Sequence, residues 1–346
     1  MGFARCSGIL MPLSSLPGGY GIGSMGAPAR KFVDFLAAAG QTIWQILPVG
    51  PTGYADSPYQ SCSAFAGNPY FIDLDQLVKD GLLTRRDFAK IHWGGDAAHI
   101  DYGTLYEKRF DVLRKAYTNF LKQRPVPGYD TPYPDDWYRF QFLSSEWLPD
   151  YCLYMAIKEA QGGAPWYAWP QPLRDRDPAA LAEAAAQLDA RVLLHAYLQT
   201  EFTRQWDAVR AYAHAHGLRI IGDLPMYVAA DSADVWAKPG QFCLDPDGQP
   251  SAVAGVPPDY FCADGQLWGN PLYAWDVMKA DGFRWWKDRV RGAAKRYDVV
   301  RIDHFRAISS YWVVPRGELT ARGGHWAPGP GPTLLQALHA AAPELE

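Results

Sequence analysis

Three stretches of the chain have the hydrophobic pattern of a helix, and each is followed by a short apolar run. Within each stretch the apolar side chains recur every three or four residues, which places them on one face of a helix. The three predicted helices span residues 30–39, 194–213 and 282–296. The apolar runs that follow them predict buried strands at 42–47, 218–222 and 297–302.

Alternation of helices with short apolar strands predicts a parallel sheet. The second and third predicted strands lead directly into an acid, Asp223 and Asp303. In a (β/α) barrel the functional groups gather at the carboxyl ends of the strands, where these two acids stand. A doubly wound sheet would show the same alternation. No G-x-G-x-x-G follows a strand, however, so the nucleotide-binding form of that fold has no support.

Longer segments separate these pairs of helix and strand. Further helices and a proline-rich stretch are predicted there, at 87–92, 105–123 and 177–188 for the helices and at 125–134 for the prolines. We therefore divide the chain into five segments. They are the first strands with a substrate loop (1–70), a mainly helical insertion (71–190), a helix and a strand ending in Asp223 (191–225), a loop-rich insertion (226–276), and a helix, the strand ending in Asp303 and a following helix (277–346).

The composition is that of a soluble globular protein, with 48% hydrophobic and 20% charged residues and a net charge of −4. We expect no nucleic-acid partner and no membrane partner, because the chain has neither a basic stripe nor an apolar run of membrane-spanning length. The five cysteines are odd in number and lack C-x-x-C spacing. They predict free thiols in a reducing compartment, and so a cytoplasmic protein. The eight histidines show no paired ligand spacing, so we expect no metal and no other cofactor.

Aromatic residues are unusually frequent in segments that read as loops. The chain has 14 Trp, 20 Tyr and 15 Phe, and many of them stand among Gly, Pro and Asp. Rings in loops suit ligands with flat apolar faces, and pyranose sugars have such faces. Ordinary packing in a tryptophan-rich protein explains the composition equally well.

The octapeptide 299–306 is the segment with the clearest chemistry. An apolar strand delivers Asp303 at its end, and Arg301 stands two residues earlier on the same face. An arginine beside a carboxylate keeps it ionised and fixes its orientation, which a nucleophilic carboxylate in a glycosidase-type reaction needs. His304 adds a side chain that can bond a sugar hydroxyl. The alternative is a structural arginine–aspartate pair at the end of a strand.

Three other segments carry candidate site residues. Asp223 ends a strand before a proline, where a turn or a helix cap is the alternative. Tyr260 and Phe261 follow two prolines that stiffen their loop, so we expect exposed stacking platforms, the alternative being rings folded under the loop. Ser57 and Tyr59 lie in a polar, aromatic loop after the first predicted strand, which could also be an ordinary turn.

Taken together, these segments resemble glycoside hydrolase family 77, the 4-α-glucanotransferases or amylomaltases. The resemblance covers essentially the whole chain and is weakest across 75–190. It is carried by residues 8–10, 14–18, 44–51, 56–68, 222–236, 256–275, 301–306 and 326–331.

The resemblance implies a (β/α)8 TIM barrel with inserted helical and loop subdomains, and a retaining double displacement. The enzyme would transfer segments of α-1,4-glucan to glucose or glucan acceptors, so its partners would be α-1,4-glucans and malto-oligosaccharides. Asp303 matches the nucleophile of the family and Arg301 the residue that holds it ionised. The residues that match substrate contacts are Ser57, Tyr59, Asp223, Tyr260, Phe261, Trp268, Asn270 and His304.

The chain departs from the family in its second and third acids. The general acid/base of the family is a Glu in a Glu-Asp-Leu-Gly segment after the next strand, and neither this motif nor the third acid is present. Glu344 and Glu346 lie outside any such motif. We therefore expect a chain truncated after about the fourth barrel strand, inactive and poorly soluble by itself. An α-amylase-type hydrolase and a non-catalytic glucan-binding remnant are the alternative functions.

Overall fold

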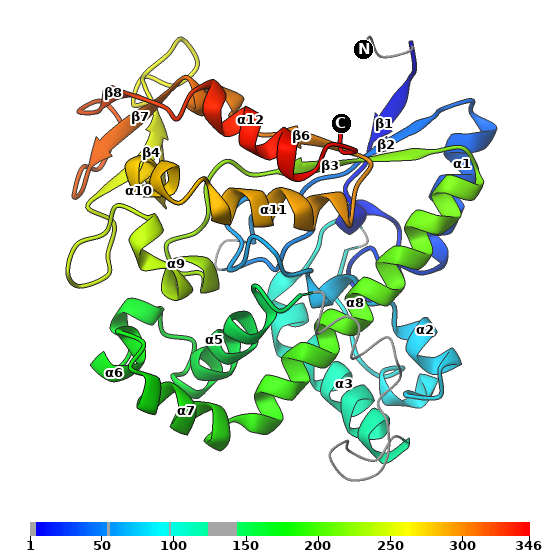
Figure 1. The fold of residues 1–346 in the computed structure, drawn as a ribbon. Helices are drawn as coiled ribbons and strands as arrows, with labels where there is room; N and C mark the ends of the chain where they lie inside the picture. The colour runs from blue at the N-terminus through cyan, green and yellow to red at the C-terminus, as the bar shows by residue number, and fades with distance from the viewer. Residues whose placement is uncertain (1–4, 54–55, 97, 124–143) are drawn as a thin grey trace. The chain divides into compact units, whose positions relative to one another are not determined.

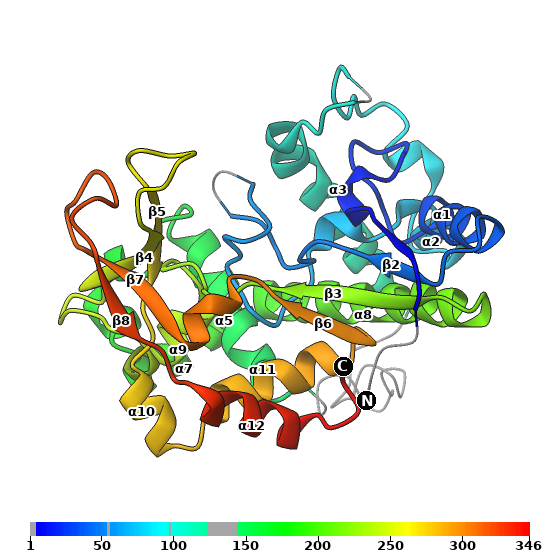
Figure 2. The ribbon, with the colours of Figure 1, turned by 90° about the horizontal axis from the view of Figure 1, so that it is seen from above.

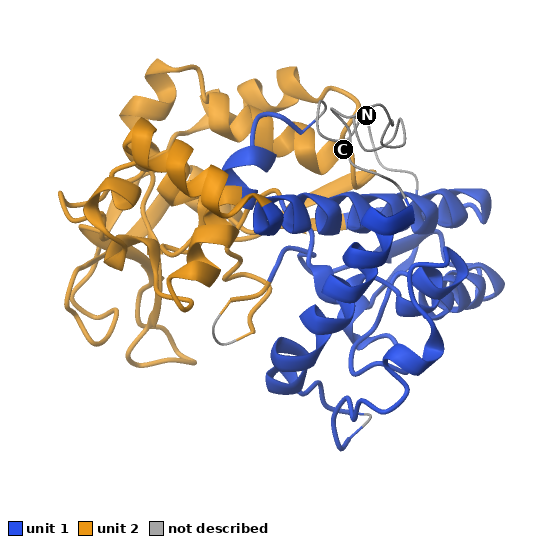
Figure 3. Cartoon of the chain, turned by 90° about the horizontal axis from the view of Figure 1, so that it is seen from below, with its two compact units in different colours: residues 1–51, 66–152, 190–221 blue, residues 52–65, 153–189, 222–346 orange. Residues whose placement is uncertain are grey.

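The structure, a computed structural model, describes residues 5–53, 56–96, 98–123 and 144–346. The proline-rich stretch 125–134 therefore lies outside the described residues. The chain divides into two compact units, each assembled from three separate stretches (Figure 3). Unit 1 consists of residues 1–51, 66–152 and 190–221, and unit 2 of residues 52–65, 153–189 and 222–346.

Unit 1 is built on adjacent parallel strands. β1 (Gly8–Leu10) pairs with β2 (Ile43–Gln45), and β2 pairs with the first half of β3 (Arg219–Leu224) (Figure 1). Two helices each precede one of these strands, α1 (Ala27–Ala38) before β2 and α8 (Asp189–Ala215) before β3. The sequence-predicted helices 30–39 and 194–213 and the strands after them are therefore confirmed, with shifted ends.

Helices make up most of the rest of unit 1. They are η1 (Leu13–Ser15), η2 (Pro69–Phe71), α2 (Leu74–Lys79), η3 (Arg85–Asp87), α3 (Tyr102–Gln123) and the start of α5 (Leu148–Ala160). The predicted helix 87–92 is wrong. The helical turn ends at Asp87, because Phe88 leaves the helical region with φ −135°. Asp87 instead closes a capping box with Thr84.

Unit 2 contains the second half of β3 and, beside it, β6 (Val299–Ile302). The Asp303 N–H, directly after β6, donates to the Leu224 carbonyl at the end of β3, 2.9 Å away. Helix α11 (Arg284–Ala294) lies against β6, and α12 (Pro332–Ala341) lies against α11 (Figure 2). The predicted helix 282–296 and the strand after it are thus confirmed.

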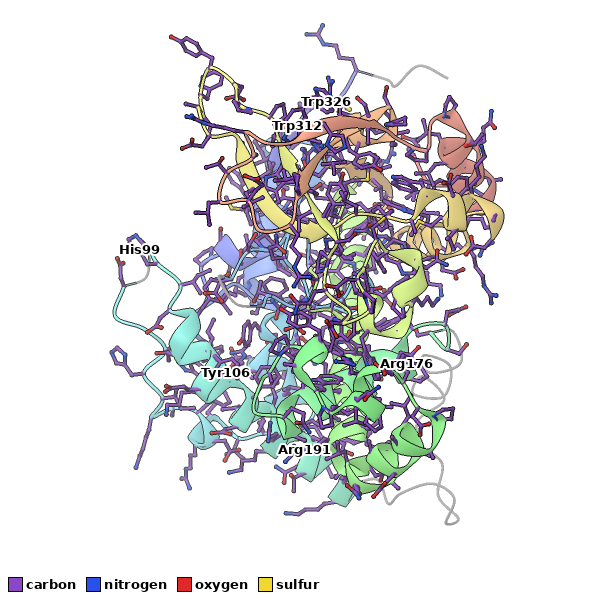
Figure 4. All side chains as sticks on the ribbon, turned by 90° about the vertical axis from the view of Figure 1, so that its left-hand side faces the viewer. His99, Tyr106, Arg176, Arg191, Trp312 and Trp326 are labelled. Carbon is purple, nitrogen blue, oxygen red and sulfur yellow. The ribbon has the colours of Figure 1, made fainter. Side chains whose placement is uncertain are left out.

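Unit 2 also contains an antiparallel sheet that the hydrophobic pattern did not predict. Its strands, in spatial order, are β5 (Gln266–Pro271), β4 (Ala252–Val256), β7 (Ser310–Pro315) and β8 (His325–Pro328). Residues 226–276, expected to be rich in loops, supply two of these strands. Trp312 and Trp326 lie close together on β7 and β8, with ring centroids 5.2 Å apart (Figure 4).

Short helices complete unit 2. They are η4 (Trp166–Ala168), α6 (Gln171–Arg174), α7 (Pro178–Gln187), α9 (Ala233–Ala237), η5 (Pro239–Gln241), α10 (Trp275–Ala280) and η6 (Phe305–Ile308). The described ranges thus form an α/β structure, but they do not close a barrel. None of the helices within these ranges is long and apolar enough to cross a membrane.

Candidate functional site

Arg301 joins two aspartates that stand at the ends of two strands of unit 2. Its guanidinium donates from Nη1 to Asp223 Oδ1 and from Nη2 to Asp303 Oδ1, both at 2.7 Å. Asp223 is the second-to-last residue of β3, and Asp303 directly follows the last residue of β6. The prediction that Arg301 and Asp303 share one face of their strand is confirmed.

The two acids differ sharply in exposure. The Asp223 side chain is 1% exposed, whereas that of Asp303 is 34% exposed. The Tyr59 hydroxyl donates to Asp223 Oδ2 at 2.7 Å, so both oxygens of Asp223 are engaged inside the protein. Asp303 is therefore the more accessible of the two carboxylates, and the arginine that bonds to it is also bonded to Asp223.

The electrostatics of this group keep its donors protonated. Burial raises the pKa of Asp223, while hydrogen bonds and charge from Tyr59 and Arg301 oppose that rise. The pKa of Tyr59 is raised by burial first and by its bond to Asp223 second, so the phenol remains a donor. Burial lowers the pKa of Arg301, but the charges of Asp223 and Asp303 outweigh it and the pKa is raised. The guanidinium thus stays charged.

His304 follows Asp303 with a left-handed backbone, φ +47°. Its ring meets Trp268 edge to face at 4.8 Å and lies 6.3 Å from the ring of Tyr227. Burial lowers the pKa of His304, against the opposing charge of Asp303, which favours a neutral imidazole. Its Nε2 has no hydrogen-bond partner among the described residues. This nitrogen is itself buried, so the neutral imidazole is a desolvated polar group in the wall beside Asp303.

Asn270 is engaged inside the protein. It is buried, and its amide nitrogen donates to the Val228 carbonyl at 2.8 Å and to Gln60 Oε1 at 3.2 Å. Gln60 donates in turn to Asn270 Oδ1 and to the Trp268 carbonyl, each at 3.1 Å. This pairing favours a role for Asn270 in holding the Tyr59 loop to β5, and a direct sugar contact stays a prediction. Ser57 helps to form the turn of that loop, since its hydroxyl accepts from the Tyr59 N–H at 3.3 Å.

Tyr260 and Phe261 are exposed, as the sequence predicts. Their side chains are 97% and 93% exposed at the tip of the connection between β4 and β5. Asp259 shapes this tip, because its Oδ1 accepts from the backbone N–H of Phe261 at 2.9 Å and of Cys262 at 2.8 Å. Within the described ranges, no hydrogen bond or ring contact links the two rings to Asp303.

Sequence reasoning missed two residues of this group, Gln60 and Tyr227. Gln60 is the neighbour of Tyr59, and Tyr227 lies four residues after Asp223. An aromatic residue shortly after the carboxyl end of a functional strand was the available signal for Tyr227. In the part of the chain that the structure describes, no group of three or more His, Cys, Asp or Glu could hold a metal ion. All five cysteines are free thiols.

Comparison with known proteins identifies a family. A sequence profile described as 4-alpha-glucanotransferase, glycoside hydrolase family 77, matches residues 11–345. A 4-alpha-glucanotransferase of Thermus thermophilus is 47% identical over 338 residues, which are 98% of this chain and 66% of that protein. One of Synechocystis sp. is also 47% identical, over 96% of this chain and 65% of that protein.

Solved structures agree with the sequence comparison. The amylomaltase from Streptococcus agalactiae in complex with acarbose has a TM-score of 0.93 and 42% identity, covering 99% of this chain and 68% of that one. The amylomaltase from Corynebacterium glutamicum shares the fold at a TM-score of 0.76 and 18% identity, over 97% of this chain and 46% of that one. The chain thus spans about two thirds of the length of the first curated relatives.

Proposed function

This chain belongs to glycoside hydrolase family 77, the 4-alpha-glucanotransferases, and we propose that it transfers segments of α-1,4-glucan to glucose or glucan acceptors. Its substrates are malto-oligosaccharides and longer α-1,4-glucans. The identity of 47% to two curated 4-alpha-glucanotransferases supports this proposal. So does the likeness to an amylomaltase that binds acarbose.

The observation that carries the proposal is the bridge from Arg301 to a buried aspartate and a partly exposed one. Asp303 is the proposed nucleophile. Its carboxylate attacks the anomeric carbon, and a covalent glycosyl ester forms as the glycosidic bond breaks. Arg301 keeps Asp303 ionised and aimed, at 2.7 Å from its Oδ1. A hydroxyl group of the acceptor then attacks the same carbon, and the ester bond to Asp303 breaks with retained configuration.

The remaining predicted residues form the proposed sugar contacts. His304 places a neutral imidazole against the ring of Trp268. Tyr59 and Asp223 complete the donor side with Ser57, and Asn270 holds their loop. Tyr260 and Phe261 offer exposed rings on which a glucan chain can stack. The acid/base motif of the family is absent from the 346 residues, so the residues present build the nucleophile side of the site.

Some finer expectations remain part of this proposal. The strands β1, β2, β3 and β6 are proposed to belong to a (β/α)8 barrel of the family type, and the five segments 1–70, 71–190, 191–225, 226–276 and 277–346 to be its parts and insertions. A cytoplasmic location also stays a prediction, as do the absence of a cofactor and of a nucleic-acid partner.

Incubation with maltotriose tests the proposal directly. The longest natural form of the protein and this 346-residue chain are assayed side by side, and the products are separated by size. Glucose together with oligomers longer than the substrate would establish transfer. Shorter products alone would indicate a hydrolase, and acarbose binding without any product would indicate a glucan-binding protein.

A further inference from the structure

Arg289 is a buried cation that bonds to the backbone directly after β3, the strand that carries Asp223. It lies on α11 and is 2% exposed. Its Nη2 donates to the Pro225 carbonyl at 2.5 Å, and its Nη1 to the Met226 carbonyl at 3.3 Å. Desolvating a guanidinium is costly, and the two bonds offset part of this cost while they hold the carbonyls of Pro225 and Met226.

Tyr273 acts on the same segment from a second element. Its hydroxyl donates to the Met226 carbonyl at 2.7 Å and lies 3.5 Å from Arg289 Nη1. Its ring stacks on Tyr227 at 5.9 Å with an interplanar angle of 17°. Tyr273 therefore fixes both the backbone and the ring of the two residues that follow Pro225.

The aromatic surroundings hold Arg289 in this position. The guanidinium carbon lies 5.3 Å from the ring centre of Trp285 and 4.9 Å from that of Trp286. Both tryptophans are buried neighbours of Arg289 on the same helix. Cation–π contact and burial leave the planar guanidinium little freedom, so its two bonds to the carbonyls have a fixed direction.

The clamped segment connects Asp223 to the sugar-facing rings. Residues 225–226 directly follow the end of β3, and Tyr227 comes next. The ring of Tyr227 lies 6.3 Å from both His304 and Trp268. Releasing the carbonyls at 225 and 226 would therefore loosen the ring of Tyr227 that lies beside His304 and Trp268.

We propose that Arg289 and Tyr273 are positioning residues for the transfer reaction, which clamp residues 225–227 so that Tyr227 holds His304 and Trp268 in their sugar-binding arrangement. This inference rests on the proposed function. It assigns no contact with substrate to either residue. Both residues are buried and act through Tyr227, so we expect their loss to affect glucan binding first.

The chain offers matched controls for both residues. Tyr154 is likewise a buried tyrosine of unit 2, and its hydroxyl donates to Asp231 Oδ1 at 2.6 Å. Arg109 is a buried arginine of unit 1 that donates to two backbone carbonyls, those of Tyr70 at 3.0 Å and Ile72 at 2.6 Å. Arg109 matches Arg289 in bonding to two backbone carbonyls, and Tyr154 matches Tyr273 in losing one hydroxyl bond of a buried tyrosine, to a carboxylate instead of a carbonyl.

The experiment compares Tyr273→Phe with Tyr154→Phe, and Arg289→Lys with Arg109→Lys, in the longest natural form of the protein. We expect each pair to lose a similar few degrees of Tm. Tyr273→Phe and Arg289→Lys should also raise the Kd for acarbose about tenfold and raise the KM for maltotriose more than they change kcat. Hydrogen exchange of the amides at 226–228 should become faster in these two variants and stay unchanged in the controls.

The outcomes separate the inference from the function on which it rests. A wild-type protein that neither binds acarbose nor transfers glucose units would overturn the proposed function, and with it the functional part of the inference. If the wild type is active, and Tyr273→Phe binds acarbose as the wild type does with unchanged exchange at 226–228, the positioning role alone is overturned. The tyrosine pair decides the question should either lysine variant fail to fold.

Discussion

The end of β3 and the end of β6 present the same residue type in the same way and yet differ in character. Each strand is largely apolar and delivers an aspartate, and one arginine bonds to both. Asp223 is 1% exposed and has Tyr59 on its other oxygen, whereas Asp303 is 34% exposed. The chain also continues differently, since His304 turns away in a left-handed conformation. Neighbouring side chains, and not the strand pattern, therefore decide which acid is enclosed and which one is accessible.

The sharpest way to break this comparison is Asp303→Asn. If Asp303 is the nucleophile, the amide should lower the transfer rate by about 10⁴-fold with little change in Tm, because no other group supplies the covalent step. The rate is measured with maltotriose in the longest natural form of the protein. Asp245, which pairs with Arg316 on unit 2, gives the matched control Asp245→Asn, for which we expect the wild-type rate. A normal rate in Asp303→Asn would remove the nucleophile assignment.

Arg301→Lys tests whether the two strand ends act through one guanidinium. A lysine carries the charge but cannot bond two carboxylates in the fixed geometry of the fork. We expect the kcat to fall about 100-fold, roughly the share that a positioned charge-assisted contact contributes, while acarbose still binds. Arg316→Lys, at the surface pair with Asp245, is the control for the same chemical change. Equal kcat values in the two lysine variants would show that the two simultaneous hydrogen bonds of Arg301 are dispensable.

Tyr59→Phe tests the buried acid of the comparison, Asp223, by removing the hydroxyl that bonds to its Oδ2. The bond from Tyr59 lowers the pKa of Asp223, which burial has already raised, so its loss should raise that pKa further. We expect the transfer rate to be about tenfold lower on the acid side of the pH profile. The acid limb of the profile should move to higher pH, because Asp223 must be ionised to pair with Arg301.

The sign for stability follows from the same shift. A carboxyl whose pKa is raised on folding contributes stability at low pH that is lost as the pH rises through the folded pKa. Tyr59→Phe should therefore lose stability relative to the wild type as the pH rises above about 4. Tyr20→Phe, which breaks a tyrosine–aspartate bond of 2.7 Å to Asp75 in unit 1, controls for the loss of the hydroxyl. An acid limb at the wild-type pH would contradict the proposed coupling.

The sequence was informative where the chemistry is local. Arg301 and Asp303 are two residues apart on a strand, so the period of the strand predicted their contact. The bond between Tyr59 and Asp223 joins residues 164 positions apart, and no pattern along the chain could reveal it. Exposure was out of reach for the same reason, because Asp223 and Asp303 look alike until their neighbours are known.

The antiparallel sheet of unit 2 shows a second limit. Its strands β4, β5, β7 and β8 are four to six residues long and contain Gly, Pro or Trp, so they lack a clean alternation of apolar and polar positions. Pairing between them, and not the local pattern, makes them strands. The burial of Arg289 could not be predicted either, because a charged residue in an ordinary helix pattern predicts a solvent-facing position.

The smallest expected effect belongs to the exposed rings of Tyr260 and Phe261. Replacing either by Ala should change the free energy of unfolding by less than about 0.5 kcal/mol, because both side chains are almost fully exposed. If the rings stack on a passing glucan chain, the KM for long glucans should rise about 3- to 10-fold, while maltotriose, which has only three glucose units, should show less change. Leu319→Ala removes an equally exposed apolar side chain, 93% exposed, and should leave both substrates unaffected. Equal effects on long and short substrates would mean that the rings do not guide the glucan chain. Asp303 would then be the accessible residue of unit 2 for which a function is still proposed.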